Sequence, residues 1–381
     1  MASYPLWLAV VLPAMGWATL APARDIHVPA DQPTIQQGID AAGGSDRVLV
    51  APGEYVEHID FQGKHIQVIG TGGAMVTTIA GAHAGAVVTF QGGESHRAVL
   101  SGFAIVRGMF GIQILGASPT IEDNDIRDND GCRGAAIHVY QGNPRLLHNR
   151  IRRNNCNCEY GSIVLLENSS ETVEGNFVVG NTGSETSAAI DSQGARKLAL
   201  ARNVVTDNAG TGVRLEFSQR AAVYDNVVAR NGGFGFDVLE AFGSAEVAAL
   251  VNNTIADNRN VDLHVEAGWG GIVQAANNVV RTSAAPASVW CSGPVFLRHS
   301  LVHADNGALM EGDCDIVDWV LTEDPQFAGG AGPHAYWLAA QSPAIDGGDD
   351  SAVERIRSDA SGAARIQGSH VDLGAYEYRE P

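Results

Sequence analysis

Five ionisable side chains at regular spacing are the residues of this chain that could do chemistry. Asp191, Arg214, Asp237 and His264 follow one another at steps of 23, 23 and 27 residues, and His138 precedes them. Two carboxylates can divide the roles of general acid and water-activating base in glycoside hydrolysis. An arginine between them can hold a substrate carboxylate or take a proton in a β-elimination. These five are therefore the candidate catalytic residues, provided that the fold stacks them.

Polar and aromatic residues a few positions further along the same segments could bind a substrate. Aromatic rings can stack on sugar rings, and carboxylates can accept hydrogen bonds from hydroxyl groups. The candidate substrate-binding residues are Tyr140, Glu216, Phe217, Glu266 and Trp269.

A repeat of about 26 residues provides the stacking. The pattern Asn-x-[Ile/Val]-x-x-Asn begins at Asn124 and recurs at steps of 25, 27, 27, 23, 27 and 25 residues, ending in a degenerate copy at Asn278. Alternating segments such as Gly212-Val213-Arg214-Leu215 precede these copies, and alternation is typical of strands with one buried face. One such unit cannot bury its apolar face alone, whereas stacked units form a continuous core.

Residues between the inward apolar positions should point outward and form columns along the stack. One column is predicted to contain Gln113, His138, Val164, Asp191, Arg214, Asp237 and His264, and the parallel column to contain Leu115, Tyr140, Leu166, Gln193, Glu216, Leu239 and Glu266. Asp191 and Asp237 then lie two coils apart, about 9.6 Å between backbones, which is compatible with the roughly 6.5 to 9.5 Å between carboxyl groups in inverting glycosidases. The alternative is that Asp191, Arg214 and Asp237 only compensate one another's charge between stacked strands.

The repeated asparagines are predicted to have a structural role. Asparagine tolerates the left-handed bends that coil corners require. Stacked side-chain amides can also hydrogen-bond along the stack as an inward ladder.

The N-terminal region reads PTIQQGIDAA over residues 33–42, RVLVAPGEY over residues 47–55 and IQVIG over residues 66–70. These segments resemble the opening of pectate-lyase-superfamily β-helix proteins. The resemblance implies a short amphipathic helix over the first coil. Ile35 and Ile39 are spaced i, i+4, as one apolar helix face between Thr34 and Ala42 requires.

The last 60 or so residues carry a second set of motifs: Asp324-Pro325-Gln326-Phe327, the segment 342–349, Gly362, Arg365 and the segment 371–377. This set resembles the choice-of-anchor Q region of secreted bacterial β-helix proteins. The acidic residues of the region are predicted to bond backbone groups where the last coil is capped, with Ca²⁺ chelation as the alternative; they are Asp346, Asp349, Asp372 and Glu377.

We therefore predict an all-β chain, a right-handed parallel β-helix solenoid of about ten coils with an N-terminal helical cap and an irregular C-terminal cap. The apolar run from Leu6 to Leu12 predicts a signal peptide over residues 1–23. Residues 24–320 are assigned to the β-helix and residues 321–381 to the choice-of-anchor Q-like cap. The expected location is secreted or periplasmic.

The five cysteines fit bonds between adjacent coils. Stacked strands lie about 4.8 Å apart, inside the roughly 4.4 to 6.8 Å Cα range of disulfides. Cys291 and Cys314 are 23 residues apart, and Cys132 precedes Cys156 by 24 residues and Cys158 by 26. We predict a Cys291 to Cys314 bond and a bond from Cys132 to either Cys156 or Cys158. A metal site at Cys156 and Cys158 is the alternative, but no further ligands stand at zinc spacing.

The balance of charge limits the partners. The chain has 24 Lys and Arg against 43 Asp and Glu, a formal net charge of −19, which repels nucleic acid and anionic membranes. The only lysines, Lys64 and Lys197, disfavour a lysine-based lyase site. No membrane span is expected after signal removal, and a monomer without a cofactor is predicted; Ca²⁺ among Asp191, Glu216 and Asp237 is the alternative.

The predicted function is an exported carbohydrate-active protein. It would bind an extracellular polysaccharide or cell-surface glycan in a groove on one parallel sheet and could cleave it as a lyase or hydrolase. The alternative is a non-catalytic secreted or cell-surface protein with an adhesive or structural role. The residue motifs of polygalacturonases, extracellular pectate lyases, pectin methylesterases and alginate epimerases are absent, so the resemblance implies the fold and a carbohydrate context but leaves the reaction open.

Overall fold

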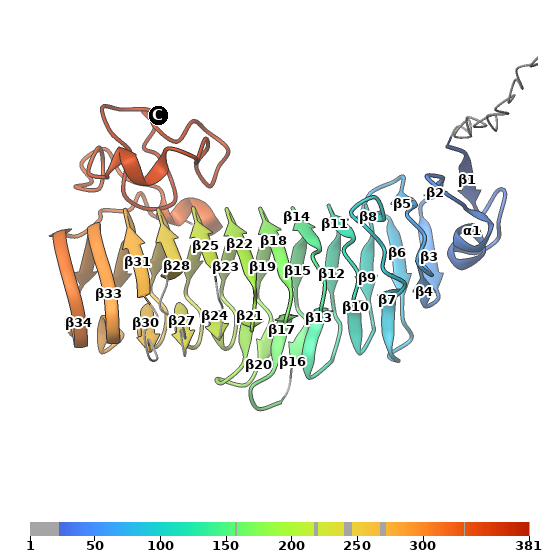
Figure 1. Ribbon diagram of the computed structural model, residues 1–381, viewed down its shortest axis with the longest axis horizontal. Coiled ribbons are helices and arrows are strands. Elements are labelled where there is room, and N and C mark those ends of the chain that lie inside the picture. Colours follow the sequence, from blue (N-terminus) through green and yellow to red (C-terminus); the bar gives the residue numbers. More distant parts are fainter. Residues whose placement is uncertain are drawn as a thin grey trace, which may run out of the picture.

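Three parallel sheets surround one apolar core and form a right-handed solenoid of about 11 turns (Figure 1). The computed structural model describes residues 23–156, 158–216, 220–239, 246–266, 272–330 and 332–380. The predicted fold class is confirmed. Every strand pairs in parallel with the strand one coil before or after it, because successive strands of a sheet are separated by a full turn of chain.

Sheet A, which each coil enters first, consists of β1 (Asp25–Val28), β2 (Arg47–Val50), β5 (Gln67–Gly70), β8 (Val99–Ser101), β11 (Thr120–Glu122), β14 (Arg145–Leu147), β18 (Ser170–Glu174), β22 (Lys197–Ala201), β25 (Ala221–Tyr224), β28 (Glu246–Val251) and β31 (Ile272–Ala276). Sheet B consists of β3 (Gly53–Val56), β6 (Thr77–Ala80), β9 (Ala104–Val106), β12 (Asp125–Arg127), β15 (Arg150–Arg152), β19 (Phe177–Val179), β23 (Val204–Thr206), β26 (Val227–Ala229), β29 (Thr254–Ala256) and β32 (Val279–Thr282).

Sheet C consists of β4 (Ile59–Asp60), β7 (Ala86–Phe90), β10 (Phe110–Leu115), β13 (Arg133–Tyr140), β17 (Ser162–Glu167), β21 (Ala188–Gln193), β24 (Thr211–Glu216), β27 (Phe236–Leu239) and β30 (Leu263–Glu266). The long strands β33 (Ala287–Ala304) and β34 (Ala308–Leu321) continue all three sheets at the C-terminal end of the solenoid. A separate two-stranded sheet, β16 (Asn155–Cys156) with β20 (Thr182–Gly183), lies between sheets B and C.

The predicted N-terminal helix is confirmed as α1 (Ile35–Ala41). Thr34 caps it by accepting a hydrogen bond from the Gln37 amide, and the Glu57 carboxylate accepts bonds from the first two helical amides. Ile35 and Ile39 are fully buried. The helix therefore covers the apolar interior at the first coil.

The repeated asparagines form two buried ladders, as predicted. In each rung the side-chain oxygen of one asparagine accepts bonds from the backbone and side-chain amides of the asparagine one coil earlier, for example Asn203 to Asn176 at 2.9 and 3.0 Å. The first ladder lies between sheets A and B and continues from Asn278 to Ser300; the second lies between sheets B and C and ends when Asn258 donates to Asp262. The ladders satisfy amide groups that the corners would otherwise leave buried without partners.

The left-handed corners are not at the asparagines themselves, and this part of the prediction was wrong. The residue before each ladder asparagine has positive φ, for example Asp123 at 54°, Arg202 at 54° and Gly175 at 66°. The left-handed residue turns the chain outward at the corner, which directs the following asparagine into the interior.

One ionisable side chain, Glu171 of β18, points into the core. Neither of its carboxyl oxygens has a side-chain partner among the described residues, and burial raises its pKa from 4.5 to about 8. Because the pKa in the fold lies above the unfolded value, the neutral acid favours folding, and stability is lost as the pH rises from about 4.5 to about 8.

Replacing this residue, Glu171→Gln, should therefore remove a pH-dependent penalty. Relative to wild type, its free energy of unfolding is expected to rise by about 2 kcal/mol between pH 5 and pH 7. Denaturant titration at both pH values measures the difference. Glu122→Gln, on the half-buried outer face of sheet A, is the matched control and should show no such pH dependence. Equal responses of the two variants would contradict the assignment.

Two disulfides link adjacent coils. Cys291 bonds Cys314 with a Cα separation of 5.2 Å, as predicted, and Cys132 bonds Cys158 with a Cα separation of 5.5 Å. This resolves the choice between Cys156 and Cys158. Cys156 is free and buried, and burial raises the pKa of its thiol, so it is a poor metal ligand and nucleophile.

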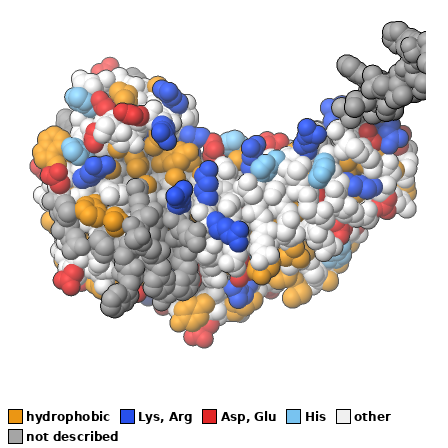
Figure 2. Space-filling view, viewed as in Figure 1, with side chains coloured by type: hydrophobic (Ala, Val, Ile, Leu, Met, Phe, Trp, Pro, Cys, Tyr) orange, Lys and Arg blue, Asp and Glu red, His pale blue; other side chains and the backbone are white. Residues whose placement is uncertain are grey.

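The C-terminal region lies along the side of the solenoid, on the outer face of sheet B (Figure 1). It contains the short helices η1 (Gly332–Tyr336) and η2 (Asp350–Val353). Tyr336, Ala375 and Tyr376 pack on outward side chains of β23, β26 and β29. Figure 2 shows the region as a lobe above the solenoid with hydrophobic side chains at its base. The predicted cap of the last coil is thus a side cover, and the outward positions of β23, β26 and β29 are all buried.

The acidic residues of this region bond backbone groups, as predicted. Asp372 accepts bonds from the amides of Asp346 and Tyr378, and Asp346 accepts a bond from the amide of His370. Asp349 caps η2 and Glu377 accepts a bond from the Asp372 amide. These contacts hold an irregular segment in one shape without strands of its own.

Candidate functional site

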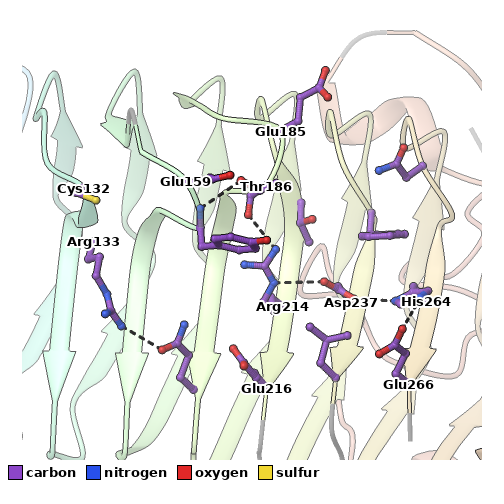
Figure 3. Close-up of a pocket in the computed structure, with 16 residues that line it drawn as sticks. Cys132, Arg133, Glu159, Glu185, Thr186, Arg214, Glu216, Asp237, His264 and Glu266 are labelled. Carbon is purple, nitrogen blue, oxygen red and sulfur yellow. Dashed lines mark hydrogen bonds and ion pairs between the residues drawn. The ribbon is translucent and has the colours of Figure 1, made fainter.

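A groove of about 860 Å³ lies along the outer face of sheet C (Figure 3). Its floor includes Arg214, Asp237 and His264. One wall is formed by the connections between sheets B and C, including Tyr160 and Thr186. The Cys132 to Cys158 disulfide links two of these connections, so the wall is covalently fixed beside the floor.

The strand register brings four of the predicted catalytic residues together. Asp191, Arg214, Asp237 and His264 are direct neighbours on β21, β24, β27 and β30. Arg214 Nη1 lies 3.8 Å from an Asp191 oxygen, and its Nε lies 3.3 Å from Asp237 Oδ2. His264 Nδ1 lies 2.8 Å from Asp237 Oδ1. The column is a connected chain of charges, which includes the charge compensation considered above.

The predicted column was wrong by one residue in β17. His138 pairs with Leu165 rather than Val164, and Tyr140 pairs with Glu167 rather than Leu166. The cause is the run of four apolar residues from Ile163 to Leu166, in which alternation cannot fix the phase of the strand, together with an irregularity in β13 between Arg133 and Ile137. A slip of one residue moves every side chain to the other face.

The corrected register reveals a second histidine–carboxylate pair that the sequence did not suggest. His138 Nε2 lies 2.7 Å from Glu167 Oε2, and Arg133 donates to Glu167 Oε1 at 2.8 Å. Arg133 also lines the groove, as Figure 3 shows, and it donates a hydrogen bond to Gln193 at 3.2 Å. His138 and Glu167 are not among the described residues that line the groove, and His138 lies three strands away from Arg214 in the same sheet.

Asp191 is fully buried and does not line the groove. Burial raises its pKa to about 7, against the opposing effect of Arg214. A carboxyl group without access to the groove cannot protonate a bound glycoside. The suggested inverting pair of Asp191 and Asp237 is thus not supported by the geometry; an Asp191 oxygen lies 3.8 Å from Arg214 Nη1 and another interaction, a hydrogen bond from Gln193, holds the carboxyl group.

Contacts with several neighbouring side chains hold His264 in place in the groove. Its ring stacks between Phe234 and Trp290, with centroids 4.5 and 4.7 Å away, and Asp237 holds Nδ1. Its Nε2 lies 3.8 Å from the exposed carboxylate of Glu266, as Figure 3 shows. A carboxylate on one ring nitrogen fixes the tautomer and leaves the other nitrogen available to exchange a proton. Trp290 follows His264 in the column, and extending the repeat past Asn278 would have found it.

The predicted substrate-binding residues are distributed along the same face. Glu216 and Glu266 line the groove, and Tyr140, with 42% of its surface exposed, lies in the column that contains Glu216. Tyr160, which the sequence did not suggest, is 66% exposed on the wall. Phe217 and Trp269 lie outside the described residues.

The described residues contain no group of three or more His, Cys, Asp and Glu side chains arranged for a metal ion. In the column, Arg214 stands between Asp191 and Asp237, where a Ca²⁺ ion had been the alternative. Among the same residues no helix is long and apolar enough to cross a membrane.

The fold and the groove define a right-handed parallel β-helix protein. A family model described as the right handed beta helix region matches residues 93–249. The structure of pectate lyase Pel9A is similar over 93% of this chain and 96% of its own, with 15% sequence identity and a TM-score of 0.60. The A-module of the mannuronan C-5 epimerase AlgE6 from Azotobacter vinelandii is similar over 77% of this chain and 95% of its own, with 15% identity and a TM-score of 0.50.

These structural similarities show a shared fold. No curated protein matches the chain in sequence. The likeness of the C-terminal region to choice-of-anchor Q stays a prediction.

Proposed function

We propose that this protein is exported and cleaves an acidic polysaccharide bound along the groove of sheet C. The observation that carries the proposal is His264, which Asp237 orients and two aromatic rings enclose in the groove. Two solved structures of the same fold bear the names of enzymes of acidic glycans, a pectate lyase and a mannuronan epimerase. The two disulfides support export to an oxidising compartment.

The geometry favours elimination over hydrolysis. Hydrolysis by inversion needs two carboxyl groups that both reach the substrate, and Asp191 does not. In an elimination, His264 Nε2 takes the proton next to the uronate carboxyl group, and the electron pair forms a carbon–carbon double bond as the bond to the glycosidic oxygen breaks. The leaving oxygen then receives the proton from the imidazolium, directly or through water. Arg214 and Arg133 are the two guanidinium groups of the described lining with which a uronate carboxylate can pair, although five carboxyl groups line the same groove.

Incubation with pectate, alginate and neutral glucans tests the proposal. Elimination is expected to give ultraviolet absorbance from unsaturated products together with new reducing ends, on an acidic glycan only. New reducing ends without absorbance would indicate a hydrolase instead. No product from any glycan would remove the catalytic proposal.

A second candidate is a glycan-binding solenoid without catalysis. The observation in its favour is that Arg214 contacts Asp237 while Asp191 lies beside it, so the floor of the groove is largely neutralised by its own ion pairs. Binding of an acidic glycan without any product would support this candidate. Turnover that depends on His264 would exclude it.

A further inference from the structure

A second concave surface lies on the other side of the solenoid from the groove, where the C-terminal region meets sheet B. This cleft has a volume of about 530 Å³. Side chains from both parts of the chain line it: His148, Phe177 and Arg202 from the solenoid and His334, Trp337 and Arg379 from the C-terminal region. It shares no lining residue with the groove.

At Phe177 the C-terminal region stops covering the outer face of sheet B. It stacks directly on Val204 in the outward column of sheet B, and Val204 is 5% exposed under the C-terminal region. Phe177 itself is 45% exposed. An apolar ring left open at the edge of a cover, inside a cleft, is a surface on which a flat ligand can stack.

Arg150 stands next to Phe177 in the same column, one coil earlier. Its side chain is exposed and makes no hydrogen bond or ion pair within the described ranges. The two arginines that line the cleft have acidic neighbours: Arg202 contacts Glu174, and Arg379 lies 3.6 Å from Asp359. Arg150 is not one of the described lining residues, but its place beside Phe177 sets an unpaired positive charge next to the cleft, on a chain of net charge −19.

The opposite wall is an ordered aromatic surface. The Trp337 ring packs against His334 with centroids 4.4 Å apart and against Tyr376 at 6.0 Å, and the Arg379 guanidinium lies 5.9 Å from its centre. These contacts fix the wall before any ligand binds, so binding costs little ordering of side chains.

We infer that this cleft is a second binding site for an acidic glycan, separate from the groove, in which a sugar ring stacks on Phe177 and its carboxylate bonds Arg150. An open aromatic ring beside an unpaired guanidinium matches a ring that carries a carboxylate. A neutral sugar would leave Arg150 unpaired, and a protein partner would need a larger apolar area than one open phenylalanine provides. The site holds a polymer without cleaving it, whether or not the groove is catalytic.

Calorimetric titration of the His264→Ala chain with a galacturonate hexamer tests this inference without turnover. Phe177→Ala and Arg150→Gln, each added to that background, are expected to weaken the same binding event roughly tenfold. Arg145→Gln is the matched charge control, because Arg145 is an exposed arginine of the same coil on sheet A. Trp319→Ala is the matched aromatic control, since Trp319 is 69% exposed outside both sites.

The inference is overturned if the hexamer does not bind, if neither cleft variant weakens binding, or if a neutral cellohexaose binds equally well. Any binding in the groove appears as an event that neither substitution changes. Absence of turnover by the wild-type chain counts against the proposed catalytic function alone, because the titration uses a chain without His264.

Discussion

Substituting His264 by alanine is expected to lower kcat on the acidic glycan that the wild-type chain cleaves by about 10² to 10⁴-fold, the usual contribution of a positioned general base. Among the described residues of the groove, only this imidazole is held by a carboxylate on one nitrogen and enclosed on both faces, by Phe234 and Trp290. Asp237→Asn should also lower kcat, because an amide can donate a hydrogen bond to the ring nitrogen and select the other tautomer.

KM should change much less than kcat in both variants, since the removed group acts on the reacting proton rather than on the bound polymer. His27→Ala is the matched control, because His27 is paired with Asp31 at 3.2 Å far from the groove. Steady-state absorbance assays of unsaturated product measure these effects. Retention of wild-type kcat by His264→Ala would remove the histidine from the mechanism, even if cleavage itself is observed.

The repeat predicted the fold because each coil carries the same residue pattern, so that the sequence gives evidence for every coil position many times. Asn176, Asn203 and Asn226 occupy equivalent rungs, and a pattern repeated in every coil withstands an error in any one of them. The same repetition predicts that Arg214, Asp237 and His264 lie side by side, and the strand register confirms it. At these positions the local residue pattern and the overall fold favour the same structure. A structure can be predicted from a sequence where the two agree.

The site was less predictable, because a site depends on single residues rather than on averages. In the apolar run from Ile163 to Leu166, alternation does not show which residues point outward. The sequence therefore did not predict Glu167 as the partner of His138. The full burial of Asp191 is a second example, because alternation predicts on which face a side chain lies but not how deeply its neighbours cover it.

The position of the C-terminal region could have been predicted from the strands of sheet B, because the alternation of polar and apolar residues stops in the strands that the region covers. The strands Val204–Thr206 and Val227–Ala229 are buried at every position, whereas Arg150–Arg152 alternates exposed and buried residues. A strand that loses its polar face has a cover on both sides. The change from alternating to continuous burial thus marks where the solenoid needs a second layer.

One buried ion cluster fastens that layer to the solenoid. Arg365 is 2% exposed, donates to Asp225 Oδ1 of the solenoid at 2.7 Å and to Glu377 Oε1 at 2.6 Å, and also bonds backbone oxygens around Gly374. Burial raises the pKa of both carboxyl groups to about 7, and Arg365 opposes this effect. Without the guanidinium, both buried carboxyl groups would lose the opposite charge that contacts them, and Asp225 would keep only the more distant Arg202.

Replacing this arginine, Arg365→Met, is therefore expected to lower the free energy of unfolding by about 3 to 5 kcal/mol, the cost of breaking a buried ion pair from one side. The loss should be larger at pH 8 than at pH 5. Acids whose pKa in the fold lies above the unfolded value destabilise the fold as the pH rises through that pKa, and removing Arg365 raises it further. Denaturant titration at the two pH values measures both effects.

Limited proteolysis adds a local measurement to the same prediction. Detachment of the C-terminal region would expose Val204, Val227 and Ala256 on the outer face of sheet B, so Arg365→Met should be cleaved faster within residues 321–381 than in the coils. Arg379→Gln is the matched control, because the Arg379 guanidinium is 40% exposed and its ion pair with Asp359 is long, at 3.6 Å. This substitution should change the free energy of unfolding by no more than about 0.5 kcal/mol. Equal stability of the two variants at pH 8 would show that apolar packing alone holds the region on the solenoid.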